Sequence, residues 1–450
     1  MKLQPGQSAA LLERKHLSKG ALIKTLKALF GKVTDKRSSR NKVIELADAL
    51  MAGFAMFSLK MPSMLSLDEL RQHPERSMNL KSLFEIGTIP SDTSMREILD
   101  SADPKELREC FSKIFAELQR GKALEQYTYL DGAYLIAIDG TGYFSSDTVH
   151  CDCCLEKHHK NGSTTYHHQM LAAVLIHPDN KIVIPLFPEP IVKQDGSQKN
   201  DCERNACKRM IERIREDHDH LKIIITEDGL SSNAPHICDL KAQRMSFILG
   251  AKPGDHKHLF EEFQLAVSSQ REVLTRDADG TVHIFRWVNG LPLNEKNQDI
   301  VVNFLDYEEC HSNGKSKHFS WVTDIEITKE NVKEIMRGGR ARWKIENETF
   351  NTLKNQGYQF EHNFGHGYKN LSTVLATLMM LAFLTDQSVL LTCKFVQDAL
   401  AKTKRMKELF REIRELFDRF YFRNWLELYS AIAYGMTSSY TLNVPIANTT

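Results

Sequence analysis

Two aspartates in this 450-residue chain follow short apolar runs that predict strands, and each precedes a glycine. Asp139 comes after the run 134–138, and Asp228 comes after the run 222–226. If both strands belong to one open α/β sheet, both carboxylates lie at its carboxyl edge, where such sheets carry their ligands. An Asp-Gly pair after a strand is also an ordinary turn signal, and this alternative stays open.

Two neighbouring carboxylates repel each other unless a cation lies between them. The pair therefore predicts Mg²⁺ or Mn²⁺, the ions that oxygen ligands hold for phosphate chemistry. A two-metal site, with ions about 3.5–4 Å apart, needs a third carboxylate. Glu346 supplies it from a predicted helix on which Arg342, Glu346, Phe350 and Lys354 follow one another at steps of four residues. The alternative is a helix that carries only surface ion pairs, worth about 0.2–0.5 kcal/mol each.

Cysteines and histidines gather in the connection that leaves Asp139. Cys151 and Cys154 have a spacing that zinc accepts, and His158 is the candidate third ligand. His167 and Cys202 are further candidates. The competing interpretation is a loop of reduced cysteines close to an active centre or to DNA. We favour that interpretation and expect no bound Zn²⁺.

The composition limits the class of protein. With 42% hydrophobic and 26% charged residues, disordered and fibrous chains are excluded. The formal net charge is only +1, yet residues 1–60 hold twelve Lys and Arg against four acids. A basic segment on a neutral chain predicts docking to a polyanion, with solvated lysines as the alternative. The candidate DNA contacts in this segment are Lys36, Arg37, Arg40 and Lys42.

Further basic residues follow the predicted strand 246–249. Lys252 and His258, together with His256, should lie at the same sheet edge as the two aspartates and meet phosphates there. A solvated loop is the alternative. Trp287 and Trp321 could stack on an unpaired base, but aromatic residues in predicted strands more often belong to the core.

The elements that position these residues change in type along the chain. Residues 1–125 have helical spacing only, and the segment after them predicts a mixed α/β sheet with an antiparallel hairpin. The expected boundaries are 1–125 for a helical DNA-binding lobe, 126–260 for the first part of the core, 261–328 for a β-rich insertion, 329–369 for the helix with the third acid, and 370–450 for C-terminal helices.

Three features of the sequence predict the cellular compartment of the protein. The nine cysteines are odd in number and clustered, unlike those of a disulfide scaffold. The first residues contain no apolar core of the kind found in a signal peptide. The apolar run 371–384 is too short to span a bilayer and stops at Asp386, so we expect a buried helix. A cytoplasmic, reduced protein with no membrane partner is the expectation.

The segments 138–141, 228–230 and 342–346 resemble bacterial insertion-sequence transposases of the DDE type. The resemblance is to the branch whose ribonuclease H-like domain is interrupted by a β-strand insertion, and it covers nearly the whole chain. Further similar segments are 62–65, 83–93 and 362–367. The family signature has Tyr, two residues, Arg, three residues, Glu, six residues and Lys. Here Gly339 takes the place of Tyr, and Lys354 falls one position late.

The resemblance implies an α/β ribonuclease H-like mixed-sheet core with a β-rich insertion, an all-helical lobe before it and helices after it. It implies that Asp139, Asp228 and Glu346 are catalytic and hold two Mg²⁺ or Mn²⁺ ions. The implied partners are double-stranded DNA, as terminal inverted repeats and target, and a second copy of the chain. The alternatives are a nuclease that only cleaves and a DNA-binding protein without catalysis. The expected DNA contacts in the core are Arg342, Lys354, Lys252 and His258.

Overall fold

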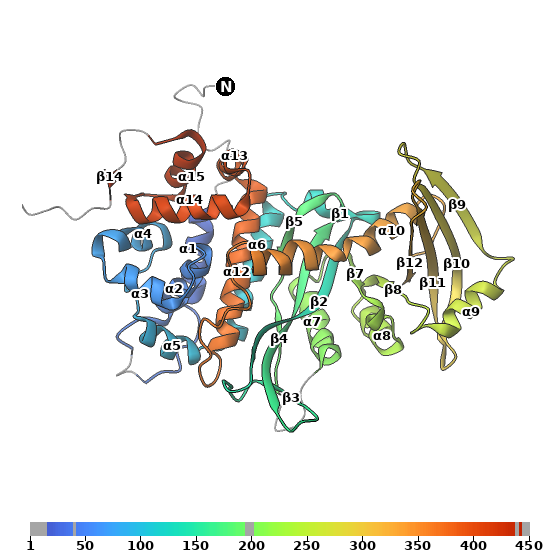
Figure 1. Cartoon of the computed structure of the whole chain (residues 1–450), viewed down its shortest axis with the longest axis horizontal. Coiled ribbons are helices and arrows are strands. Elements are labelled where there is room, and N and C mark those ends of the chain that lie inside the picture. The colour runs from blue at the N-terminus through green and yellow to red at the C-terminus, as the bar shows by residue number, and fades with distance from the viewer. Residues whose placement is uncertain (1–15, 39–41, 194–201, 437–440, 443–450) are drawn as a thin grey trace, which may run out of the picture.

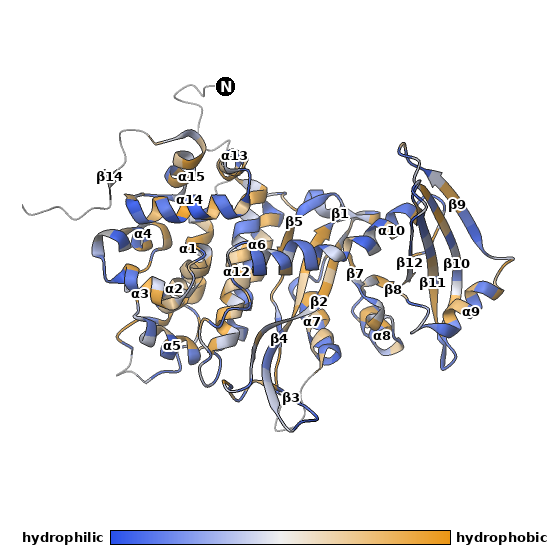
Figure 2. Ribbon diagram, viewed as in Figure 1, coloured by the Kyte–Doolittle hydropathy of each residue, from blue (hydrophilic) through white to orange (hydrophobic). Residues whose placement is uncertain are grey.

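The computed structural model describes residues 16–38, 42–193, 202–436 and 441–442. A helical lobe occupies one side of the molecule, and a long sheet runs from it to the other side (Figure 1). Hydrophobic residues concentrate along α12 and in the strands of the central sheet (Figure 2).

The predicted helices at the start of the chain are confirmed. They are α1 (Lys19–Phe30), α2 (Leu46–Ser58), α3 (Met64–Arg71), α4 (Pro74–Phe84), α5 (Asp92–Asp100) and α6 (Arg108–Arg120). Ser18, Ser63 and Ser91 each cap a helix by accepting a hydrogen bond from a backbone amide of its first turn. Nearly every residue of α2 is buried, which makes α2 a central helix of the lobe.

The C-terminal helices complete this same lobe. They are α12 (Leu371–Thr392), α13 (Lys394–Thr403), α14 (Met406–Arg419) and α15 (Trp425–Tyr434). The Asn79 amide donates to the carbonyls of Phe417 and Phe420, and the Trp425 indole donates to the carbonyl of Leu83. The N-terminal helices and the C-terminal helices are therefore packed together as one helical body.

The predicted buried helix is present as α12, which is longer than the apolar run 371–384. It has 22 residues and continues through Asp386, because that carboxylate is paired inside the lobe with Lys19 and Lys60. Among the described residues it alone has the length and composition to cross a membrane. Its most apolar 18-residue window is 94% buried, as in the core helix of a folded domain.

The predicted mixed sheet is present and has twelve strands. The hydrogen-bonded order is β3-β4-β2-β7-β8-β12-β11-β10-β9, while β1 pairs with β2, and β5 and β6 pair with β4. Strand β7 is parallel to both β2 and β8, and the other pairings are antiparallel. The strands before the insertion are β1 (Thr128–Tyr129), β2 (Ala133–Ser146), β3 (Leu155–His158), β4 (Thr164–His177), β5 (Asn180–Pro185), β6 (Glu189–Ile191), β7 (Ile223–Glu227) and β8 (Ser246–Gly250).

Two helices connect the parallel strands, as parallel pairing requires. Helix α7 (Glu203–Asp217) precedes β7, and α8 (Ala234–Ala242) links β7 to β8. The cap of α8 is Asn233, whose side chain accepts from the amide of His236. Ser232, which precedes the cap, donates to the carbonyl of Gly250.

Strand β2 does not end at Ile138, as the apolar run predicted. It pairs with β7 only along 134–137, and from there it continues as one arm of a hairpin with β4. Asp139 therefore lies within the strand, at the point where its parallel pairing ends. The apolar run stops here because the next part of β2 leaves the covered centre of the sheet.

The β-rich segment extends the core sheet. Its strands are β9 (Arg271–Arg276), β10 (Val282–Asn294), β11 (Asn297–Cys310) and β12 (Ser316–Thr323), and α9 (Lys257–Leu265) precedes them. Strand β12 pairs with β8, so insertion and core share one hydrogen-bonded sheet. Trp287 and Trp321 are each 5% exposed and belong to the core.

The packing of Trp321 explains an unusual pair of glycines in α10 (Val332–Ala341). A Cβ built on Gly339 would lie 2.3 Å from the Trp321 indole nitrogen, and one on Gly338 would lie 3.1 Å from the Tyr129 ring. The glycines let α10 approach the sheet closely despite their low helix propensity. This contact positions the helical segment that follows α10.

Glu309 on β11 ties the insertion to α10. Its carboxylate accepts hydrogen bonds from Arg340, Lys317 and Tyr307. Burial alone would raise the pKa of Glu309, but these three donors lower it to about 2. A lowered carboxyl pKa adds stability that is present above the unfolded-state value and is lost as the pH falls through the folded-state value.

We expect Glu309→Gln to lower the Tm at neutral pH, because it removes roughly 3 kcal/mol of pH-dependent stabilisation. The difference in Tm between wild type and variant should shrink as the pH falls from about 4.5 toward about 2. Thermal unfolding followed by circular dichroism over this range measures it. A difference that stays constant with pH would show that the carboxylate charge is not what stabilises this contact.

Candidate active site

The three acids predicted from the sequence come from separate elements around one edge of the sheet. Asp139 lies on β2, and its Oδ1 accepts from the amide of Gly140 at 2.9 Å. Asp228 follows β7, and its Oδ1 accepts from the amide of Leu230 at 2.9 Å. Both aspartates line a cleft of about 550 Å³. Glu346 lies beyond α10, on the helical segment that contacts β2.

The charges of these acids act on one another. Burial, together with the nearby carboxylates of Asp228 and Glu346, raises the pKa of Asp139 to about 6. Arg342 opposes this rise, because its Nη1 lies 3.2 Å from Oδ2 of Asp139. The ion pair also fastens the segment that carries Glu346 to β2. Three carboxylates and one guanidinium therefore form a single electrostatic unit.

Glu346 lies in a π-helical turn, Ile345–Phe350, and not in the continuous α-helix that the sequence predicted. A π-turn adds residues per turn, so the expected row of side chains at steps of four is broken after Glu346. Phe350 is buried in the core. Lys354, an expected DNA contact, lies in α11 (Asn351–Asn355). Its ammonium group pairs at 3.0 Å with the carboxylate of Glu361, in the loop that follows α11.

A fourth carboxylate, Glu203, lies beside Asp139 and was not identified from the sequence. A Cβ built on Gly140 would lie 2.5 Å from Oε1 of Glu203, which lines the same cleft. Glu203 begins α7, and no local pattern distinguishes it from an ordinary first-turn acid, which helix N-termini favour. Only the packing of α7 against the sheet, through β4 and β6, places it here.

The donor set of this edge suits a hard divalent cation. Oxygen ligands in carboxylate groups are those that Mg²⁺ and Mn²⁺ prefer. Burial is the largest cause of the raised pKa of Asp139, and the carboxylates of Asp228 and Glu346 add smaller contributions. Asp139, Asp228 and Glu346 are the residues that could hold such an ion, with Glu203 next to them.

The expected phosphate contacts after β8 have different surroundings. Lys252 is exposed, and its side chain passes beside Gly229, next to Asp228. His256 contacts the carbonyl of Ser232 at 3.0 Å and so holds this loop in place. The Nε2 atom of His258 is buried, with no hydrogen-bond partner among the described residues. Of the three, Lys252 is best placed to meet a ligand at the acidic edge, the part of the sheet edge where Asp139, Asp228 and Glu346 lie.

Most of the N-terminal cations have partners within the fold. Arg37 pairs with Asp35 and also donates to the carbonyl of Ile44. Lys42 donates to the carbonyl of Asp35, and Lys36 lies 3.6 Å from Asp103. Arg40 lies outside the described residues. Three further lysines of this segment pair with buried acids inside the lobe, namely Lys19, Lys27 and Lys60. The charge excess counted from the sequence is therefore not all at the surface.

The cysteine and histidine cluster differs from the predicted ligand set. Cys151 and Cys154 do lie together, with their sulfur atoms 3.9 Å apart. His158, however, is exposed on the β3–β4 hairpin and contacts Thr164. The imidazoles beside the two sulfur atoms belong to His168 and His366. The prediction of His158 as a neighbour of the cysteines is therefore wrong, because the hairpin carries it away.

Comparison with known proteins gives little. No protein-family model and no curated protein match the chain. One similar solved structure is that of a piggyBac transposase synaptic complex with hairpin DNA, with 11% identity, coverage of 93% of this chain and 81% of that chain, and a TM-score of 0.40. Another is the NurA nuclease from Sulfolobus solfataricus, with 10% identity, coverage of 52% and 83%, and a TM-score of 0.22. Both TM-scores are too low to support conclusions about function.

Proposed function

We propose that this chain is a DNA transposase of the DDE type, with a ribonuclease H-like core, which cleaves element ends and joins them to target DNA. The observation that carries the proposal is the convergence of Asp139, Asp228 and Glu346 from three separate elements. Asp228 and Glu346 lie close enough to Asp139 to add to the rise that burial causes in its pKa, and this proximity supports a cation-binding role for the three acids. The sequence resemblance to insertion-sequence transposases implies the same role for these three residues and so supports the proposal.

Each residue has a distinct task in this proposal. Asp139 and Asp228 hold a divalent ion from adjacent strands, and Glu346 closes the site from the helical side. A divalent ion bound there supplies activation of the attacking oxygen and stabilisation of the leaving oxygen. Arg342 holds the π-turn against β2. Exposed Lys252 binds a DNA phosphate close to Asp228.

A cleavage assay tests the proposal. The full chain is incubated with Mg²⁺ and a supercoiled plasmid that carries the gene and its flanking DNA. We expect strand cleavage at element ends and joined products that disappear with EDTA. Cleavage without joining would replace the proposal with a nuclease, and retention without cutting would replace it with a non-catalytic DNA-binding protein.

Arg342 should affect catalysis more than affinity. Arg342→Gln removes the guanidinium that pairs with Asp139 and fixes the position of the Glu346 turn, and a displacement of about 1 Å in a catalytic group can lower a rate by about 10²-fold. We expect a loss of this order in cleavage rate and little change in the Kd for DNA. Single-turnover cleavage and gel-shift titrations measure the two quantities. Equal losses in both would assign Arg342 to phosphate binding instead.

A further inference from the structure

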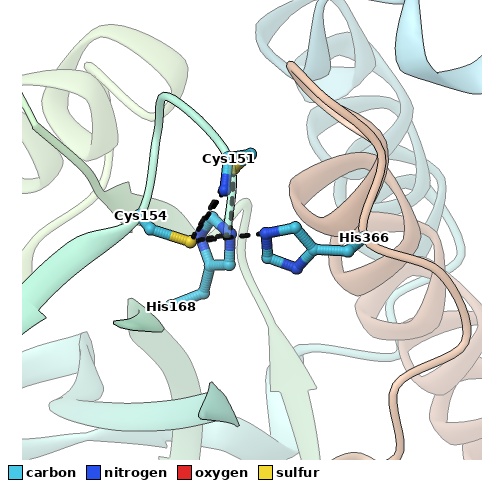
Figure 3. A group of neighbouring side chains, drawn as sticks. All are labelled: Cys151, Cys154, His168 and His366. Carbon is cyan, nitrogen blue, oxygen red and sulfur yellow. Dashed lines mark hydrogen bonds between the residues drawn. The ribbon is translucent and has the colours of Figure 1, made fainter. Parts of the chain in front are cut away.

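Four buried side chains meet beside the hairpin of β2 and β4, on the side that faces the helical lobe (Figure 3). Cys151 and Cys154 come from the loop between β2 and β3, His168 from β4, and His366 from the segment between α11 and α12. Their ligand atoms all lie within 4.8 Å of one another. His168 and Cys154 are 0% and 1% exposed, and His366 is 7% exposed.

Four of the six distances between ligand atoms in this group match a tetrahedral zinc site. With Zn–S of about 2.3 Å and Zn–N of about 2.0–2.1 Å, ligand atoms should be about 3.8 Å apart for two sulfurs and about 3.6 Å apart for sulfur and nitrogen. The two sulfur atoms are 3.9 Å apart. The Cys154 sulfur lies 3.4 Å from Nε2 of His168 and 3.3 Å from Nε2 of His366. The Cys151 sulfur lies 3.5 Å from Nε2 of His168.

Hydrogen bonds alone do not account for this convergence. The Cys154 sulfur is next to two imidazole nitrogens and the Cys151 sulfur, and it also accepts from the amide of Cys151 at 3.4 Å. A thiol has a single, weak hydrogen to donate. The other ring nitrogen of each histidine, Nδ1, is buried with no partner among the described residues, so no hydrogen bond from it explains the orientation of the ring.

Aromatic neighbours hold the two imidazoles in position. His168 stacks on Tyr143 with ring centroids 5.6 Å apart and planes 13° apart. His366 lies 4.3 Å from the ring of Phe144. Tyr143 and Phe144 belong to β2, the strand that also carries Asp139. The group is thus fixed by the same strand that carries the first catalytic aspartate.

Contrary to the expectation from the sequence, we propose that Cys151, Cys154, His168 and His366 bind a structural Zn²⁺ ion. Four protein ligands close a tetrahedral site and leave no open position, which is the arrangement of structural and not catalytic zinc. The ion joins the hairpin to the segment that links the Glu346 helix with α12. The ion thereby fixes β2, which carries Asp139, relative to the helical segment that carries Glu346. This proposal is independent of the DNA chemistry, since a chain without any transposase activity would still bind the metal.

The test is the zinc content of the full-length chain, purified without chelators from zinc-supplemented cells and dialysed against metal-free buffer. We expect about one zinc per chain by elemental analysis. Cys151→Ser combined with Cys154→Ser should lose it. Cys202→Ser combined with Cys238→Ser is the matched control, because it also removes two cysteines, both exposed, and should retain the metal.

A second pair of variants separates the observed ligands from the predicted one. His366→Ala should weaken zinc retention during dialysis, whereas His158→Ala should leave it unchanged. Less than about 0.1 zinc per wild-type chain, or full retention in the Cys151/Cys154 double variant, would overturn the proposal.

Cobalt substitution keeps the test valid if a variant fails to fold. Wild-type protein loaded with Co²⁺ should show the visible bands of tetrahedral cobalt and a near-ultraviolet thiolate charge-transfer band. Six-coordinate cobalt without the thiolate band would overturn the assignment of these four ligands.

Discussion

Asp139→Asn, Asp228→Asn and Glu346→Gln are each expected to reduce metal-dependent DNA cleavage by at least about 10²–10³-fold, the cost of removing one group that stabilises transition-state charge. Each change removes a charged oxygen ligand and keeps the side-chain shape nearly constant. DNA binding should remain within a few-fold of wild type, since in the proposed function the acids bind metal and not phosphate. Single-turnover cleavage with Mg²⁺ and gel-shift titration measure the two effects.

Glu348→Gln is the matched control for this series. Glu348 lies two residues after Glu346 on the same π-turn, and its charge acts on Lys344. Cleavage by this variant should equal that of wild type. A catalytic-site variant that cuts at nearly the wild-type rate would remove that residue from the active site.

The largest effect on stability is expected for Asp386→Asn. The carboxylate of Asp386 lies 2.7 Å from the ammonium groups of both Lys19 and Lys60, whose side chains are 1% exposed. Although burial opposes it, the two lysines lower the pKa of Asp386, and burial lowers the pKa of Lys60 to about 8. Removing one partner of a buried ion pair costs about 3–5 kcal/mol, because it leaves a buried charge unpaired.

Asp418→Asn is the control for this change. Asp418 also joins the C-terminal helices to the N-terminal ones, through Arg76, but both side chains are 40% exposed. An exposed ion pair is worth about 0–1 kcal/mol, so the Tm should hardly change. Replacing Lys19, Lys60 and Asp386 together with apolar residues of similar size should restore most of the stability. Equal effects of Asp386→Asn and Asp418→Asn would contradict the importance of burial.

The acidic edge was accessible from the sequence because its signals are local. Asp139 and Asp228 follow apolar runs, and the strands that these runs form are neighbours in the sheet. The continuation of β2 beyond Asp139 was not accessible, because that part of the strand is defined by its partner β4. The π-turn at Glu346 was missed for a similar reason, since helical spacing alone does not reveal an added residue in one turn.

Features that join distant parts of the chain were missed. Asp386 looked like the end of an apolar helix, because its partners Lys19 and Lys60 are more than three hundred residues away. His366 was noted only as part of a segment similar to one in transposases, and nothing in its neighbourhood relates it to Cys154. In both cases the tertiary fold brings the partners together, and their spacing in the sequence does not predict the contact.

The most direct test of the active-site assignment is the position of bound Mn²⁺ in crystals of the full chain, located by anomalous diffraction near the manganese absorption edge. We expect manganese between Asp139, Asp228 and Glu346, and its loss from this edge in Asp228→Asn crystals. Manganese bound elsewhere, or no manganese at this edge at millimolar concentrations, would contradict the assignment of the three carboxylates as the metal-binding site.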